Sequence, residues 1–161
     1  MKVELEEMPQ EARLWVYQAD RKLNEDEIEK LSQLTSSFLA RWEAHGQPLT
    51  AAFEIRFAQF LIIAVNESLH GATGCSIDSS VQLVRQLEEI LHVSFLDRSK
   101  VAYLKGEEVT LSPLPKIKAI AASGSIDRDT MVFDNSVASF GEYQNRWLKP
   151  AQDSWLKRYL P

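Results

Sequence analysis

The segment at residues 70–80 combines a turn of small residues with side chains that could bind an anion or attack a substrate. It reads HGATGCSIDSS and contains two of the six glycines and the only cysteine of the chain. An amphipathic helix is predicted to follow, and the free N–H groups and positive dipole at a helix start favour anions. The ligand-binding candidates in this segment are Gly74, Cys75, Ser76, Ser79 and Ser80.

The same pattern also describes an ordinary capped helix. In that interpretation Ser76 or Asp78 caps the helix, and the two glycines only turn the chain. The carboxylate of Asp78 would then occupy the helix start and repel an anionic ligand. The sequence leaves both interpretations open, anion binding and simple capping.

Cys75 is the candidate nucleophile, because a helix N-terminus lowers the pKa of a thiol and favours the thiolate. A catalytic cysteine also needs a base, and the candidates are His70 and His45. The chain has no C-x-x-C pair, and Val81 stands where a C-x5-R motif would need arginine. A buried, unreactive cysteine is the alternative interpretation.

Glu54 and Arg56 are two further ligand-binding candidates. They alternate with apolar residues along one predicted strand, so their side chains share a face and can pair with each other. If that face is open, they could join Trp42 and His45 to line a shallow pocket. The alternative is a solvated or structural ion pair.

The composition is that of a soluble globular protein. The chain has 161 residues, 45% of them hydrophobic and 25% charged, which suits one domain with a sizeable core. The net charge of -5 argues against binding to nucleic acid, which needs a surplus of lysine and arginine. The single cysteine cannot form an internal disulfide, which fits a reducing compartment.

No leader sequence, membrane span or metal site is predicted. Residues 1–7 are acidic and lack an apolar stretch, and the longest apolar run, residues 60–65, is too short to cross a bilayer. The histidines are too scattered for H-x3-H or H-E-x-x-H. We therefore expect a cytoplasmic protein with no membrane partner, no metal and no cofactor.

Periodicity predicts the elements that would position these residues. Apolar alternation and β-branched runs predict strands at 14–17, 53–57, 60–65, 101–104, 109–111 and 130–133. Helical spacing predicts helices at 24–45, 76–92 and 114–123, the first with Asn24 as N-cap and Glu27 as its capping-box partner. Residues 53–65 could form a hairpin or one long bent strand.

These elements predict an α+β protein. The first hundred residues have the order β-α-β-β-α-β of a ferredoxin-like unit, with two helices on one antiparallel sheet. A C-terminal α-β-α extension follows. We expect a single domain over residues 1–161, with a loose lead-in at 1–12, a core at 13–104 and the extension at 105–161.

Six short signatures together resemble a known group of proteins: Trp15-Val16-Tyr17-Gln18 with Asp20-Arg21, Trp42 with Ala44-His45-Gly46, Glu54-Ile55-Arg56, the stretch at 74–80, Val132-Phe133-Asp134-Asn135, and Asp153-Ser154-Trp155. Over nearly its full length the chain resembles a family of small uncharacterised bacterial proteins, some of which carry an automatic label of ABC transporter ATPase. The resemblance implies a single soluble domain.

The residues do not support the ATPase label. A P-loop needs G-x-x-x-x-G-K-[ST], so that backbone amides surround the phosphates and a lysine reaches them. No glycine of this chain is followed by lysine, and Cys75 stands after Gly74 where a lysine would be needed. We therefore exclude a P-loop ATPase.

Two functions follow from the sequence. The first is a soluble, non-catalytic binding or interaction module, which could associate with a second copy through its aromatic C-terminal residues. The alternative is a small enzyme, or a protein that binds an anion or phosphorylated metabolite at residues 74–80 and Cys75. In that case Arg56, His45 and His70 would assist. We favour the binding module over the enzyme.

Overall fold

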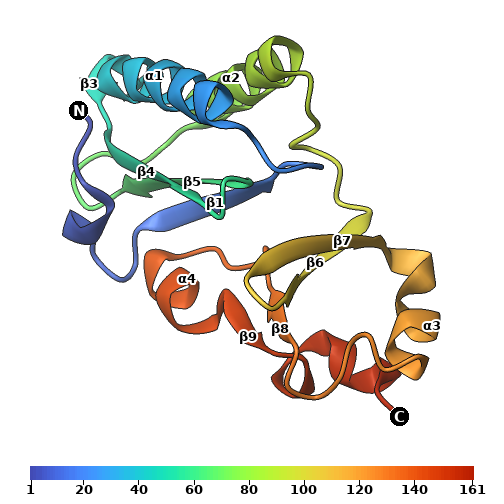
Figure 1. Cartoon of the computed structure of the whole chain (residues 1–161). Coiled ribbons are helices and arrows are strands. Elements are labelled where there is room, and N and C mark those ends of the chain that lie inside the picture. The colour runs from blue at the N-terminus through green and yellow to red at the C-terminus, as the bar shows by residue number, and fades with distance from the viewer.

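The computed structural model describes all 161 residues, which form two larger antiparallel sheets and one two-stranded sheet (Figure 1). The first sheet has the order β1 (Arg13–Gln18), β5 (Phe60–Asn66), β4 (Thr50–Arg56). The second has the order β7 (Glu108–Pro113), β6 (Lys100–Lys105), β8 (Met131–Phe133), β9 (Leu148–Pro150). A small hairpin of β2 (Glu43–Ala44) and β3 (Gln47–Pro48) lies between the first helix and β4.

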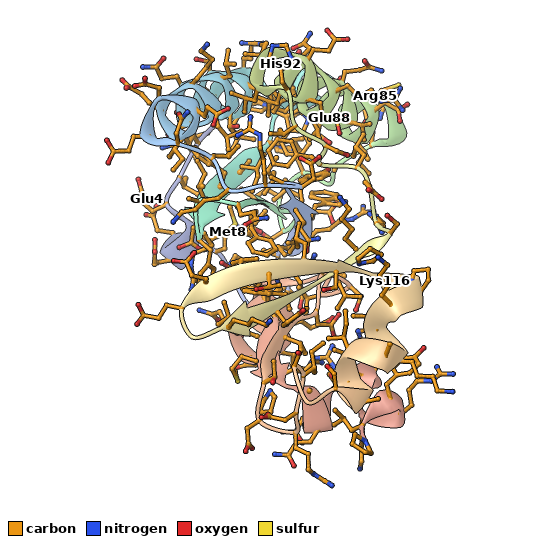
Figure 2. All side chains as sticks on the ribbon, turned by 45° about the vertical axis from the view of Figure 1, so that its right-hand side comes forward. Glu4, Met8, Arg85, Glu88, His92 and Lys116 are labelled. Atoms are coloured by element: carbon orange, nitrogen blue, oxygen red, sulfur yellow. The ribbon has the colours of Figure 1, made fainter.

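Helices α1 (Glu25–Arg41) and α2 (Gly74–Leu91) cover one face of the first sheet, and the second sheet lies on the opposite side (Figure 1). The central strand β5 is buried on both faces. Leu61, Ile63 and Val65 pack under the helices, while Phe60, Ile62 and Ala64 pack toward the C-terminal half. Figure 2 shows Arg85, Glu88 and His92 on the helical layer and Lys116 at the other half of the molecule.

The C-terminal half adds short elements around the second sheet. Helix α3 (Ile117–Ala122), which follows the 3-10 turn η2 (Leu114–Lys116), packs with the 3-10 turns η3 (Ala151–Asp153) and η4 (Trp155–Tyr159) on β6 and β8 around a small third core. Helix α4 (Phe140–Arg146) packs between the sheets with η1 (Leu5–Glu7). Residues 1–12, expected as a loose lead-in, bury Leu5, Met8 and Ala12 in this layer.

The structure confirms the α+β class and the cap of the first helix. The Asn24 side chain accepts from the Glu27 amide over 2.8 Å, and the Asn24 amide donates to the Glu27 carboxylate over 3.0 Å. Residues 53–65 belong to a hairpin, in which Arg56 faces Phe60. The first helix ends at Arg41, earlier than expected, because the chain reverses at His45 and Gly46 to form the β2–β3 hairpin.

The four-stranded ferredoxin-like sheet is not found. Its fourth strand, β6, pairs with β7 and β8 and not with β1. Two causes act together. The turn at 105–108 gives β6 a local partner in β7, whereas residues 138–140 cover the free edge of β1. There the Leu14 amide donates to the Ala138 carbonyl over 3.1 Å, and the Phe140 amide to the Ala12 carbonyl over 2.9 Å. The predicted order α-β-α does occur after β7, as α3, β8 and α4, but β8 joins the sheet of β6.

Candidate functional site

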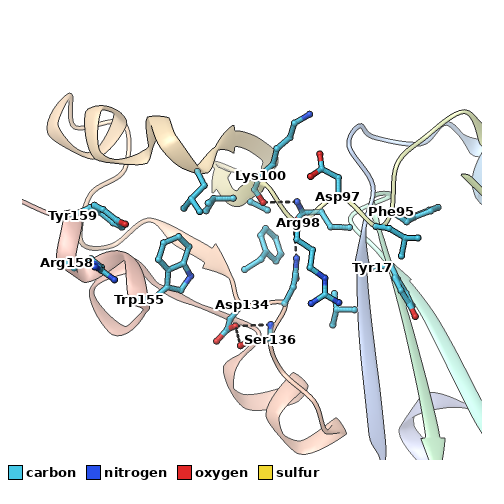
Figure 3. Close-up of a pocket in the computed structure, with 18 residues that line it drawn as sticks. Tyr17, Phe95, Asp97, Arg98, Lys100, Asp134, Ser136, Trp155, Arg158 and Tyr159 are labelled. Carbon is cyan, nitrogen blue, oxygen red and sulfur yellow. Dashed lines mark hydrogen bonds between the residues drawn. The ribbon is translucent and has the colours of Figure 1, made fainter. Parts of the chain in front are cut away.

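The largest cavity is a cleft of about 480 Å³ between the two sheets, called here the inter-sheet cleft (Figure 3). It is lined by the end of β1, the loop from Phe95 to Arg98, the start of β6, the residues that follow β8, and η4. In Figure 3, Trp155, Arg158 and Tyr159 lie on one side of the view and Phe95, Asp97 and Tyr17 on the other. The cleft therefore brings together segments that are far apart in the sequence.

A chain of side-chain hydrogen bonds fixes the floor of the cleft. The Gln18 side chain is only 8% exposed; its Nε2 donates to the Lys100 carbonyl over 3.3 Å. Asn135 Nδ2 donates to Gln18 Oε1 over 2.9 Å, and Trp147 Nε1 donates to Asn135 Oδ1 over 2.9 Å. Because buried amides are costly to leave unpaired, this series of hydrogen bonds fixes the two sheets relative to each other.

Some charged side chains of the cleft have an ion-pair partner and others do not. The Asp134 carboxylate accepts from Lys149 Nζ over 2.9 Å and from the amide and hydroxyl of Ser136. Burial acts against the charged form, but these hydrogen bonds outweigh it and hold the pKa of Asp134 below its usual range. By contrast, the cations Arg98, Lys100 and Arg158 form no ion pair within 4.0 Å. A second carboxylate, Asp97, also lines the cleft; hydrogen bonds from Ser99 and the charge of Lys100 lower its pKa.

The cleft also has an apolar wall. Three of the six exposed large apolar side chains of the protein line it: Leu96, Leu114 and Trp155, of which Trp155 is 44% exposed. Tyr17 lies on the opposite wall, where burial raises the pKa of its hydroxyl and the charge of Arg98 partly offsets this. The Tyr17 hydroxyl therefore stays protonated at neutral pH.

The candidate residues at 74–80 form the first turns of α2, and their hydroxyls are bound within the helix. Thr73 is the N-cap, where Ser76 or Asp78 was predicted: Thr73 Oγ1 accepts from the Ser76 amide over 3.2 Å, and Ser76 Oγ accepts from the Thr73 amide over 2.6 Å. Ser79 Oγ donates to the Cys75 carbonyl, and Ser80 Oγ to the Ile77 carbonyl. Gly74 is the first residue of the helix.

Cys75 is exposed, so the interpretation as a buried cysteine is wrong. No hydrogen bond joins its thiol to His70 or His45. His70 lies in the exposed loop before α2, and His45 lies in the β2–β3 turn with φ +51°. Trp42 is buried on the helical side, where its Nε1 donates to the Ser76 carbonyl over 2.8 Å.

Glu54 and Arg56 do not form the predicted pocket with Trp42 and His45. Their strand turns them toward the second sheet, as it does the neighbouring Ala52, whereas Trp42 packs under the helices. They meet Tyr143 of α4 instead, whose hydroxyl donates to Glu54 Oε2 over 2.6 Å. This contact joins residues that are distant in sequence, so no local pattern indicated it.

Sequence reasoning did not select the cations of the inter-sheet cleft or Trp155 as site residues. Three of the six signatures of the sequence contribute residues to the lining of the cleft. They supply Val16-Tyr17-Gln18, Phe133-Asp134-Asn135 and Trp155. These segments share no hydrophobic period, and only the fold shows that they meet.

The chain matches no known family model, and comparisons with curated proteins and with solved structures find no match either. No three His, Cys, Asp or Glu side chains gather closely enough to hold a metal ion. None of the helices is both long and apolar enough to cross a membrane. The function must therefore be argued from the cavities themselves.

Proposed function

We propose that the protein is a non-catalytic binding module whose ligand is a small organic anion with a flat apolar part, held in the inter-sheet cleft. One observation carries this proposal. In a chain of net charge -5, three cations without ion-pair partners and three exposed apolar side chains line the same cavity. Such a combination of an apolar wall and a few polar groups is typical of small-molecule sites.

The chemistry of the lining supports an anion. The guanidinium groups of Arg98 and Arg158 can donate two parallel hydrogen bonds to a carboxylate or phosphate, and Lys100 adds a third positive charge. The indole of Trp155 offers a flat surface for an aromatic or heterocyclic ring. A cavity of about 480 Å³ accommodates a ligand of this size.

The polar groups of the cleft support binding without catalysis. Gln18, Asn135 and Asp134 are already bound to each other or to neighbouring residues, so they hold the structure. Asp97, the other carboxylate of the lining, accepts from the Ser99 amide over 2.8 Å. No histidine or cysteine belongs to the lining. Association with a second copy of the chain and a cytoplasmic location stay predictions.

A thermal-shift screen tests the proposal. The screen compares the midpoint of thermal unfolding with nucleoside monophosphates, sugar phosphates, aromatic carboxylates and their uncharged analogues. A ligand that binds only the folded state raises this midpoint. We expect stabilisation by an anion that carries a ring, and its loss in Arg98→Ala. Stabilisation by the same anion should persist in three control variants: Arg41→Ala on α1, Cys75→Ala and Ser79→Ala.

Two results would overturn the proposal. One is a screen in which no anion stabilises the protein. The other is stabilisation that survives Arg98→Ala but disappears in Ser79→Ala, which would move the site to the start of α2 and restore the alternative based on residues 74–80.

A further inference from the structure

A second cavity of about 400 Å³ lies away from the inter-sheet cleft. It is formed by η1, the end of β4, α4 and the start of β9. Its charged lining residues are Glu6, Glu54 and Arg56, and its aromatic ones are Phe140, Tyr143 and Trp147. None of these residues belongs to the lining of the cleft, so the two cavities can be tested separately.

Arg56 is held in place on several sides. Its guanidinium carbon lies 5.3 Å from the centre of the Phe57 ring and 5.5 Å from that of Trp147, which are cation–π distances. Its Nη1 donates to the Tyr143 hydroxyl over 3.3 Å and lies 4.0 Å from Glu54 Oε2. The Tyr143 hydroxyl in turn donates to Glu54, so its oxygen is oriented to accept from Arg56.

Most of the donors of this fixed guanidinium remain free. A guanidinium has five N–H groups, and Nη1 is the only nitrogen of Arg56 in a hydrogen bond. The Arg56 side chain is 40% exposed, so a ligand in the cavity can reach it. Because its position is already set, binding costs little of the side-chain entropy that a surface arginine would lose.

The turn beside Arg56 is strained in a way that helps to hold it. Phe57 and Ala58 have φ of +54° and +52°, which L residues rarely adopt. The strain is offset by packing, because the Phe57 ring lies 5.3 Å from that of Phe133 and 6.2 Å from that of Trp147. Such strain persists only where the surroundings over-determine it, and it concentrates at binding sites.

The charges of the cavity select the ligand class. A simple anion would be attracted by Arg56 but repelled by the carboxylates of Glu54 and Glu6, and a simple cation would meet the opposite balance. A zwitterion satisfies both signs. We propose that the second cavity binds a small zwitterion of the α-amino acid type. Its carboxylate lies on Arg56, its ammonium group faces Glu54 and Glu6, and an apolar side chain packs on Trp147.

NMR of the four indole N–H groups tests this with free amino acids as probes. Each amino acid is titrated at millimolar concentration beside the α-hydroxy acid and the amine that lack one of its charges. We expect an amino acid to shift the Trp147 signal, identified with Trp147→Phe, and to leave that of Trp155 in the cleft unchanged. Both single-charge analogues should bind severalfold more weakly, since one charged side chain of the cavity then lacks its partner in the ligand.

Matched variants complete the test. Arg56→Lys keeps the charge but loses the planar fork, and Glu6→Gln alters an exposed side chain that does not endanger folding. We expect both to weaken binding severalfold, while Arg41→Lys on α1 leaves it unchanged. The proposal is overturned if no amino acid binds, if the hydroxy acid binds as tightly as the amino acid, or if both variants bind normally. All three outcomes are read from the Trp147 signal, whereas an anion bound in the inter-sheet cleft is expected to shift the Trp155 signal.

Discussion

The indole N–H of Trp147 donates to Asn135 Oδ1 over 2.9 Å, while the ring of Trp147 forms a wall of the second cavity. Asn135 itself lines the inter-sheet cleft. Trp147 therefore links the two cavities: its indole N–H binds a residue of the cleft, and its ring borders the second cavity. Around it, the rings of Phe60, Phe133 and Tyr143 lie with centres 5.0 to 5.1 Å away.

Trp147→Phe should destabilise the protein by about 2–4 kcal/mol. The change removes the only donor to Asn135 Oδ1 and leaves space inside an aromatic cluster. Urea unfolding measures the effect. Trp155→Phe, in a half-exposed position, is the control and should change stability by less than about 0.5 kcal/mol. Equal losses in both variants would contradict the role given to the Asn135 hydrogen bond.

Thr35→Val should raise the free energy of unfolding by about 1 kcal/mol. Thr35 is fully buried in α1, and its Oγ1 has no hydrogen-bond partner, so the folded state carries an uncompensated desolvation cost. The midpoint of thermal unfolding should rise by about 3 °C. Thr35→Ser keeps the hydroxyl and loses the methyl group, so it should lower stability instead. An increase with serine would refute the argument.

Ala58→Gly should stabilise the protein by about 1 kcal/mol. Ala58 has φ +52°, a conformation that glycine adopts without the clash of a Cβ atom. Ala119→Gly in α3 is the matched control, and it should destabilise by about the same amount because a helix interior disfavours glycine. Thermal unfolding of the two variants should therefore show shifts of opposite sign. Two shifts of the same sign would rule out strain at Ala58.

The difference in stability between the wild type and Glu27→Gln should depend on pH. The hydrogen bond from Arg21 and that from the Asn24 amide lower the pKa of Glu27 to about 2, below its usual 4.5. A lowered carboxyl pKa stabilises the fold above the unfolded value, and the effect is lost as the pH falls through the folded value. Glutamine keeps the capping box but not the charge.

Urea unfolding of both proteins from pH 6 to pH 2 measures this effect. The difference in the free energy of unfolding between the wild type and Glu27→Gln should be constant above about pH 5. It should decrease between about pH 4.5 and pH 2. Glu107→Gln, in the exposed turn between β6 and β7, gives the background change. A difference that stays constant down to pH 2 would show that the Glu27 charge does not contribute.

The sequence predicts those features of the fold that depend on residues close together in the chain. The apolar run of β5 and the Asn24–Glu27 capping box follow from neighbouring residues, and both are found. The sequence does not decide between a hairpin and a bent strand at residues 53–65, because the turn contains no glycine. In the structure, packing of Phe57 on the C-terminal half holds that turn. The ferredoxin-like order predicts that β6 pairs with β1, and this is wrong because the distant residues 138–140 cover the β1 edge while β6 pairs with β7 and β8.

The candidate sites were harder to predict than the elements. Glu54 and Arg56 were selected because they share a strand face, but their partner Tyr143 is far along the chain. The residues at 74–80 form a helix start, as the sequence indicates. Their hydroxyl groups form hydrogen bonds with backbone groups of the N-cap and first turns of α2. Arg98 belongs to none of the quoted signatures, and that of Trp155 does not indicate a cleft; only the packing of the two sheets places both residues around one cavity.

The covered edge of β1 has a consequence for how the protein is made. Because synthesis proceeds from the N-terminus, β1, β4, β5 and both long helices are complete once Leu91 has left the ribosome. The helical side of the sheet can then close, but Phe60, Ile62 and the β1 edge stay open until residues 138–140 and α4 arrive. An open edge beside an apolar face is a template for aggregation. A nascent chain that stalls before this point is therefore exposed to aggregation through the β1 edge.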